Sequence, residues 1–315
     1  MTETGFETTD RRVSDRAQRK SAAKQADYGV LWLALSARAA RHPSPSFRRQ
    51  IRPDGVYFTR GAPEEWRQRP GVRHVALTDA IILVQGKGTG CDVLAWAEMK
   101  PRRVIATDLY AFDESGEQIA AECRDRLGVT VEFRQAALED HRFLGSSSID
   151  LCASAAVLGH CRDIQSVLAK SMRLLRPGGS FYAAYGSLWY GPGGNHFSGR
   201  DGMESIYNHL GLDEGAYGAY VKAHLRPRED IQSGGRYVEL DLFSGFATRG
   251  YLVAFEEAEF IRDGLVVELS PDALSYRKRF PERWRALLAR LDGQCNEDDL
   301  IIKTNFVHLL KSGGR

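Results

Sequence analysis

The sequence predicts an α/β protein built on a doubly wound, mostly parallel sheet. Two observations lead to this fold class. Short, wholly apolar runs alternate with helical segments about five times between residues 80 and 186, as they do when strands are buried on both faces of a parallel sheet. A glycine-rich stretch also follows the first of these runs directly, at the place where open α/β sheets bind their ligands.

Seven segments are predicted to be strands, because each is a short apolar or alternating run that ends at a turn signal. They cover residues 80–84, 104–108, 129–133, 149–154, 180–186, 265–270 and 305–311. Apolar residues at the helical period predict helices over residues 92–99, 117–127, 163–175, 251–260 and 280–292. The last strands and helices complete the same sheet, so we expect no separate C-terminal domain.

The segments outside the alternation of strands and helices divide the chain into three parts. Residues 1–25 are polar and rich in Arg, Lys, Ser and Thr, which predicts a solvated tail. Residues 26–75 are expected to form an N-terminal helical cover, with a helix over 28–41 followed by an irregular stretch containing one short strand. Residues 76–315 form the main domain, in which 187–248 are expected to be an insertion, or lid, over the sheet edge.

Composition and charge argue against several classes of protein. Lys and Arg number 43 against 41 Asp and Glu, a formal net charge of only +2, so we expect no binding of nucleic acid through the whole surface. No run reaches the ~18 apolar residues of a membrane span, and the start lacks the plan of a secretory signal; both observations favour the cytoplasm. Five cysteines without a CxxC pair and dispersed histidines predict no disulfide framework and no metal site.

The strongest functional signal is the loop in which Gly86, Gly88 and Gly90 follow a buried apolar run. Glycines are needed where the chain turns sharply and a ligand touches its backbone. A phosphate-binding P-loop requires a glycine where this chain has Ile81. A dinucleotide-binding fingerprint requires Gly or Ala where it has Cys91. The spacing G-x-G-x-G therefore fits neither pattern well.

An acid at the end of the next predicted strand supports a nucleotide site. Asp108 lies 18 residues after Gly90, where a carboxylate can accept hydrogen bonds from both hydroxyls of a ribose. The alternative is an ordinary helix N-cap. Both features also occur in dinucleotide-binding folds, so they do not name the cofactor by themselves.

Four motifs follow one another between about residue 80 and 186: the G-x-G-x-G loop, Ile149-Asp150-Leu151, Val157-Leu158-Gly159-His160 followed by Asp163, and Arg173-Leu174-Leu175-Arg176-Pro177-Gly178-Gly179. In type and in order they resemble the motifs of class I S-adenosylmethionine (SAM)-dependent methyltransferases. The last is the most specific, because its Pro-Gly-Gly turn follows a helix and leads into a strand. Together these matches make chance a poor explanation.

The resemblance implies a seven-stranded, class I methyltransferase-like sheet with SAM as cofactor. The cofactor-binding residues that it implies are Gln85, Gly86, Gly88, Gly90, Asp108, Leu109, Ala137, Leu138 and Ser154. The family usually has Asp or Glu at the position of Gln85, where the carboxylate helps to hold the amino group of the cofactor. A glutamine carbonyl accepts the same hydrogen bond without charge assistance. With Gln85 at this position, SAM would bind more weakly or in an altered pose, or another residue would compensate for the missing charge.

Candidate residues for the acceptor side follow the fifth predicted strand. Methyl transfer requires alignment of the nucleophile and removal of a proton from a hydroxyl or a protonated amine. His196 is the first candidate base, since an imidazole takes up a proton near neutral pH, and a structural histidine is the alternative. His160 is the second catalytic candidate, with shaping of the cofactor pocket as the alternative. Trp189, Tyr190 and Asn195 are candidates for substrate binding, although aromatic residues in such loops often pack in the core.

The sequence therefore predicts a SAM-dependent methyltransferase acting on an oxygen or nitrogen of a small-molecule acceptor of the natural-product or saccharide type. The N-terminal cover and the insertion favour an enclosed pocket over an open groove for a polymer. Several alternatives stay open: a SAM-fold protein with another reaction or no catalysis, methylation of a macromolecule, and a dinucleotide-dependent oxidoreductase. The acceptor, the methylated atom and the oligomeric state, a homo-oligomer included, are not fixed by the sequence.

Overall fold

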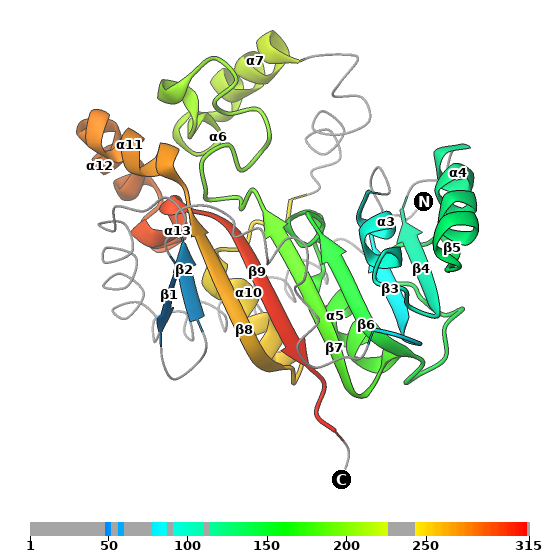
Figure 1. The fold of residues 1–315 in the computed structure, drawn as a ribbon. Coiled ribbons are helices and arrows are strands. Elements are labelled where there is room, and N and C mark those ends of the chain that lie inside the picture. The colour runs from blue at the N-terminus through cyan, green and yellow to red at the C-terminus, as the bar shows by residue number, and fades with distance from the viewer. Residues whose placement is uncertain are drawn as a thin grey trace, which may run out of the picture.

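The computed structural model describes residues 48–51, 56–59, 77–86, 91–109, 114–225 and 243–313. These residues form a nine-stranded sheet with the order β1-β2-β8-β9-β7-β6-β3-β4-β5 (Figure 1). The strands are β1 (Arg48–Ile51), β2 (Val56–Thr59), β3 (Ile81–Gln85), β4 (Arg103–Asp108), β5 (Thr130–Gln135), β6 (Ile149–Ala155), β7 (Leu175–Gly186), β8 (Ile261–Leu269) and β9 (Ile302–Leu310).

The predicted doubly wound sheet is confirmed, and strands β3 to β9 are the seven that the sequence predicts. Strands β3 to β7 run parallel to one another. The last strand, β9, lies between β7 and β8 and is antiparallel to both. The carboxyl ends of β3, β4, β6 and β7 therefore meet at one edge of the sheet, where the residues expected to bind ligands follow them.

The N-terminal segment adds two strands where one was expected. Strand β1 pairs antiparallel with β2, and β2 pairs parallel with β8 at the sheet edge. The β-branched and aromatic residues of Val56–Thr59 favour a strand, whereas the arginines and glycines around them hide this preference in the sequence pattern. The predicted polar tail and the helix over 28–41 lie outside the described residues.

Helices cover both faces of the sheet (Figure 1). Helices α3 (Cys91–Ala97) and α4 (Glu114–Glu122), the latter continued by a π-helical turn at Cys123–Leu127, lie on one face, and α5 (Ile164–Leu174) and α10 (Thr248–Glu257) lie on the other. Successive side chains of β3 therefore point to opposite faces of the sheet. Leu83 joins the core under α5 and α10, whereas Ile82 and Val84 join the core under α3.

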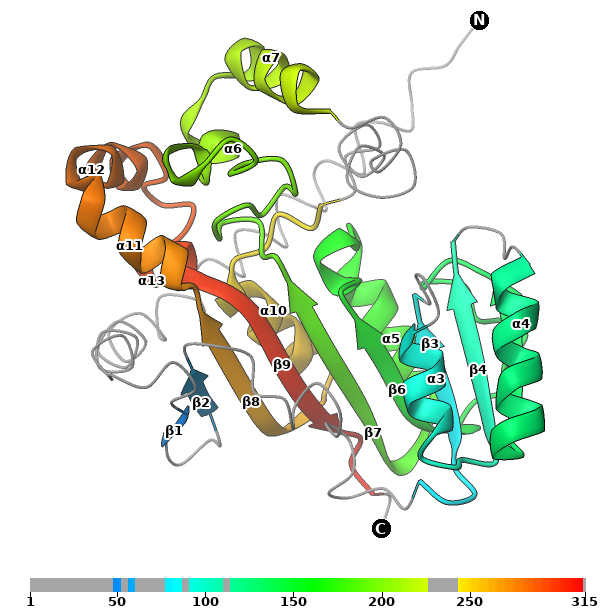
Figure 2. The ribbon, with the colours of Figure 1, turned by 45° about the horizontal axis from the view of Figure 1, so that its top comes forward.

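A layer of short helices lies beyond the ends of β7 and β8 (Figure 2). It contains α6 (Asn208–Gly211), α7 (Glu214–His224), α11 (Pro271–Arg279), α12 (Pro281–Arg290) and α13 (Glu297–Ile301), with a 3-10 turn at Met203–Ser205; another 3-10 turn, Leu158–His160, follows β6. The ring of Tyr207 packs 5.0 Å from that of Tyr276 and 5.8 Å from that of Trp284. Residues 187–225 therefore pack on the C-terminal helices. Among the described helices, none is long and apolar enough to cross a membrane.

A side-chain cap fixes the connection between β6 and α5. The carboxylate of Asp163 accepts a hydrogen bond from the backbone N–H of Ser166 at 2.9 Å, as an N-cap residue does. The 3-10 turn before it contains His160. The cap therefore holds His160 in a connection whose two ends, β6 and α5, are both anchored in the core.

A buried ion cluster joins α10 to α13. Arg249 is fully buried, and its guanidinium contacts the carboxylates of Asp298 and, at 3.3 Å, Asp299. Asp299 also accepts a hydrogen bond from the backbone N–H of Thr248 at 3.2 Å. Because charges buried without partners are strongly destabilising, the cluster fixes the start of α10 against the helix that precedes β9.

Replacement of Arg249 by methionine should lower the free energy of unfolding by about 3–5 kcal/mol, because it leaves two carboxylates buried and unpaired. Urea unfolding measures this change. Arg285→Met removes an arginine that pairs with Glu282 on the surface and should cost less than about 1 kcal/mol. Equal losses in the two variants would contradict the structural role of the cluster.

Candidate functional site

A sharp backbone turn ends β3 at Gly86. Its φ angle of +79° lies in the left-handed region, which favours glycine. A Cβ atom at this position would lie 2.2 Å from Cγ2 of Val157, the second residue after β6. The end of β3 can approach the end of β6 so closely only because residue 86 has no side chain. Gly88 and Gly90 lie outside the described residues.

Three buried polar residues stand in register at the ends of β4, β3 and β6: Thr107, Gln85 and Ser154. The Nε2 of Gln85 donates to Oγ of Ser171 on α5 at 3.0 Å. Among the described residues, Gln85 Oε1 and Ser154 Oγ are buried without a hydrogen-bond partner. Such atoms are uncommon in folded proteins, so a ligand that carries hydrogen-bond donors fits this edge of the sheet.

Asp108 ends β4 beside the turn that follows β5. Its backbone oxygen accepts a hydrogen bond from the N–H of Ala136 at 2.9 Å, which places Ala137 and Leu138 next to the strand end. The side chain of Leu109 is 51% exposed. The acid expected to hold a ribose therefore lies beside two further residues expected to bind the cofactor, Ala137 and Leu138.

His160 and His196 meet beyond the carboxyl ends of β6 and β7. Their Nε2 atoms are 3.2 Å apart, and their rings are stacked with 5.1 Å between centroids. The ring of Phe243 packs against both, at 5.3 Å and 5.9 Å, and lies 5.2 Å from the ring of Trp189. Four rings from three separate parts of the chain thus form one aromatic wall: His160, His196, Phe243 and Trp189.

Burial keeps His196 neutral at physiological pH. Burial first, and then the nearby His160 and Arg200, lower the pKa of His196 to about 4. Two neutral imidazoles share a contact between their Nε2 atoms only when one nitrogen carries a hydrogen and the other accepts it. The two rings therefore hold complementary tautomers, and protonation of one disfavours protonation of the other.

Hydrogen bonds from buried side chains shape the loop that carries His196. Asn195 Oδ1 accepts from the backbone N–H of Ser198 at 2.9 Å. The ring of His209 contacts Oγ of Ser198 at 3.0 Å and the backbone oxygen of Trp189 at 2.7 Å. These contacts tie both ends of the loop together, so the backbone position of His196 is fixed from both sides.

The three residues predicted to bind substrate have different surroundings. Trp189 belongs to the aromatic wall. Tyr190 packs against the main hydrophobic core, and burial raises its pKa to about 12. Asn195 is buried with its carbonyl oxygen engaged by backbone N–H groups. Of the three, only Trp189 joins the wall that contains the histidines.

Comparison with known families identifies the class of this domain. Residues 83–183 match the family model described as a methyltransferase domain. Over these residues the chain contains a SAM-dependent methyltransferase domain. SAM is therefore its cofactor, and the buried, unpartnered Gln85 Oε1 and the turn at Gly86 fit a ligand at the carboxyl ends of β3, β4 and β6. No curated protein sequence matches the methyltransferase.

Solved structures similar to the methyltransferase have low sequence identity. A geranyl diphosphate C-methyltransferase from Streptomyces coelicolor, solved with Mg2+, geranyl diphosphate and S-adenosyl-L-homocysteine, is 13% identical, with 79% of this chain and 78% of that chain covered and a TM-score of 0.47. A SAM-dependent methyltransferase from Methanosarcina mazei is 16% identical, with 76% and 96% covered and a TM-score of 0.47. At these scores neither likeness carries an argument about the acceptor.

Two residues near the site were not found from the sequence. His141 is fully buried, with Nε2 3.3 Å from Oγ1 of Thr107, and burial lowers its pKa to about 4. It lies three residues after Leu138, one of the cofactor-binding residues that the resemblance implies, and this was the available signal. Phe243, which completes the aromatic wall, follows a stretch of weak periodicity and gave no signal.

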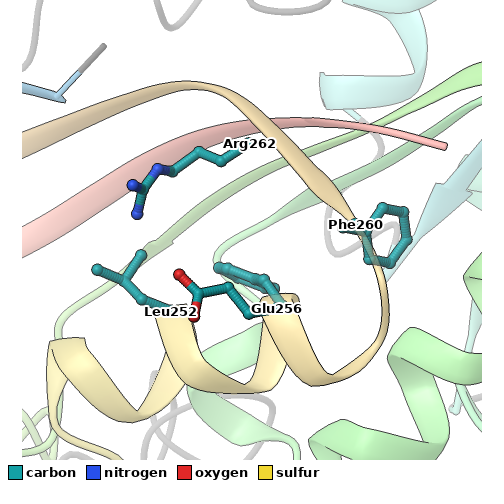
Figure 3. Close-up of a pocket in the computed structure, with 5 residues that line it drawn as sticks. Leu252, Glu256, Phe260 and Arg262 are labelled. Atoms are coloured by element: carbon teal, nitrogen blue, oxygen red, sulfur yellow. The ribbon is translucent and has the colours of Figure 1, made fainter. Parts of the chain in front are cut away.

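The cavity in Figure 3 lies away from these groups. It has a volume of about 250 Å³ and is lined by Leu252, Phe255, Glu256, Phe260 and Arg262. These residues belong to the end of α10 and the beginning of β8, at the opposite edge of the sheet from Gly86. Within the described part of the chain, no three His, Cys, Asp or Glu side chains are grouped to hold a metal ion.

Removal of the carboxylate of Asp108 should weaken cofactor binding. If it accepts hydrogen bonds from both ribose hydroxyls, Asp108→Ala should raise the dissociation constant of S-adenosylhomocysteine roughly 100-fold, since hydrogen bonds to charged groups are worth about 1.5–3 kcal/mol each. Isothermal titration calorimetry measures the constant. Glu117→Ala removes an exposed acid from α4 and should leave it unchanged, and an equally unchanged Asp108→Ala variant would remove Asp108 from the site.

Buried histidines should make the protein lose stability in weak acid. Burial lowers the pKa values of His141, His196 and His209 to about 4, from 6.5. The unfolded chain therefore binds more protons below pH 6.5, and stability falls as the pH drops toward 4, by about 1 kcal/mol per pH unit for each such histidine. Urea unfolding at about pH 7 and about pH 5 should show a smaller loss for His209→Gln than for the wild type, and an equal loss in the two proteins would contradict this account.

Proposed function

We propose that the methyltransferase transfers a methyl group to an oxygen or nitrogen of a small-molecule acceptor, with His196 as the general base. His160 is its hydrogen-bonded partner. The observation that carries this proposal is the 3.2 Å contact between their Nε2 atoms beyond the ends of β6 and β7. An imidazole pair at this edge of the sheet, in a mostly apolar wall, is suited to take a proton from a substrate.

The cofactor would be held at the ends of the neighbouring strands. SAM, when bound, supplies an electrophilic methyl group on a sulfonium. Asp108 would accept hydrogen bonds from the ribose, and Ala137 and Leu138 would border the adenine. Gln85 Oε1, which has no partner among the described residues, would accept a hydrogen bond from the amino acid end, beside the backbone turn at Gly86.

The low pKa of His196 favours an oxygen acceptor over a nitrogen. A hydroxyl becomes strongly acidic while its oxygen forms a bond to carbon, so even a weak base takes its proton. An alkylammonium, by contrast, has a pKa near that of lysine, about 10.4. It would not give its proton to an imidazole whose pKa is about 4. The proton of the hydroxyl would thus move to a ring nitrogen of the histidine pair.

The surroundings of the pair support a small acceptor with an apolar or planar part. Trp189 and Phe243 offer ring faces next to the histidines, and aromatic walls of this kind favour ring stacking. The layer of α6, α7, α11 and α12 lies beyond the end of β7 (Figure 2). We include residues 187–248 in the acceptor side of a catalytic domain that spans 76–315.

Replacement of His196 should slow methyl transfer without loss of cofactor. His196→Ala removes the base, and loss of a general base typically costs about 100- to 10,000-fold in rate. The dissociation constant of S-adenosylhomocysteine should stay within about twofold of the wild-type value. Turnover is measured as formation of S-adenosylhomocysteine with an acceptor found by screening hydroxylated small molecules.

The control for this experiment is His224→Gln, which changes a half-buried histidine on α7 whose Nδ1 contacts the backbone oxygen of Tyr220. This variant should keep the wild-type rate. Full activity in His196→Ala would show that His196 is not the base. Equal losses in the two variants would point to a structural effect of the region and not to proton transfer.

A further inference from the structure

The backbone of His196 has a conformation that its surroundings must hold in place. Its φ angle of +67° lies in the left-handed region, which residues with a Cβ atom rarely adopt and which persists only where other contacts fix it. The N–H of His196 donates to the backbone oxygen of Gly193 at 2.9 Å. Its own backbone oxygen accepts a hydrogen bond from Nε of Arg200 at 3.1 Å. Arg200 therefore holds the carboxyl side of this residue.

The guanidinium of Arg200 is itself fixed by two further contacts. Its Cζ lies 4.0 Å from the centroid of the ring of Phe197, which is fully buried, and a cation over an aromatic face is attracted to it. Nη1 donates to the backbone oxygen of His224 at 2.8 Å, a main-chain contact that a side-chain substitution at residue 224 leaves in place. The planar fork of an arginine suits two such bonds at once. Arg200 thus joins the backbone of His196 to the last residue of α7.

Helix α7 depends on polar contacts of this kind, because none of its side chains is buried. The hydroxyl of Tyr220 donates to the backbone oxygen of Phe197 at 3.1 Å and to the carboxylate of Asp201 at 2.7 Å. Nε2 of His224 lies 3.9 Å from the same carboxylate. Most helices are held in place by an apolar face. Here the contacts of Arg200 and Tyr220 attach α7 to the loop that carries the histidine.

The charged and titratable groups that face the ring of His196 are His160, from the connection after β6, and Arg200. The other rings of the aromatic wall are uncharged. Asp201 follows Arg200 in the chain, but its carboxylate accepts a hydrogen bond from Tyr220. Burial, His160 and Arg200 together lower the pKa of His196, since a positive charge beside an imidazole disfavours its protonation. A proton taken from an acceptor would therefore leave the ring readily after transfer.

We infer that Arg200 is a positioning residue for the proposed general base: it fixes the backbone of His196 against the end of α7 and keeps a positive charge beside the imidazole. The inference rests on the proposed function and adds a residue to it. Arg200 does not touch the acceptor in this role. It acts through His196, by its position and by its charge.

The test compares variants that separate the charge of Arg200 from its hydrogen bonds. Arg200→Met removes both, and Arg200→Gln is a second neutral variant that keeps one amide donor. Arg200→Lys keeps the charge without the planar fork. The matched control is Arg290→Met, because Arg290 is an exposed arginine of α12 whose Nη2 donates to the backbone oxygen of Leu212, before α7, at 2.9 Å.

The first readout is the protonation of His196, followed by NMR of protein with labelled histidine and assigned by the signal that His196→Gln lacks. In the wild type the ring should stay neutral at about pH 5, because its pKa is about 4. The two neutral variants should protonate at a pH higher by roughly one unit, whereas Arg200→Lys and Arg290→Met should follow the wild type. An unchanged titration in the neutral variants, or an equal rise in Arg200→Lys from a merely loosened loop, overturns the inference.

The second readout is turnover with an acceptor found by screening. Arg200→Met should lower kcat roughly 10- to 100-fold, as for a misplaced catalytic group, and leave the dissociation constant of S-adenosylhomocysteine within about twofold of the wild-type value. Arg290→Met should keep the wild-type kcat. An unchanged kcat in Arg200→Met overturns the inference while the proposed function stands. Full activity in His196→Ala overturns the proposed function, whereas the NMR titration needs no acceptor and still tests the contact between Arg200 and His196.

Discussion

The close approach of β3 to β6 at Gly86 is the constraint on which the rest of the site depends. No side chain fits between the backbone at Gly86 and Val157, so the two strands end at the same level and their following turns face each other. The glycine loop that we propose binds the cofactor follows Gly86 in the chain, and the connection that carries His160 follows β6. A single residue without a side chain therefore joins the geometry of the cofactor side to that of the acceptor side.

The acceptor side depends on buried side chains that have no chemical role of their own. Asn195 and His209 fix the loop after β7 through backbone contacts, and this places His196 opposite His160. The apolar surroundings that these contacts create also lower the pKa of His196. The same packing thus fixes the position of the imidazole and keeps it neutral.

Most of the sheet could be predicted from the sequence, because buried parallel strands leave apolar runs that end at glycines. The edge strands β1 and β2 could not, since arginine and glycine interrupt the pattern there. On the proposed cofactor side, contiguous motifs allow individual residues such as Gly86 and Asp108 to be predicted from the sequence. The pairing of His160 with His196 could not be predicted, because a contact across 36 residues depends on the path of the intervening loop.

The position of the cofactor is tested most directly by a crystal structure of the protein with S-adenosylhomocysteine. The account predicts the ribose at Asp108, the sulfur facing the space in front of His160 and His196, and the amino acid end beside the turn at Gly86. A nucleoside bound elsewhere, or an amino acid end that points away from Gly86, would contradict it.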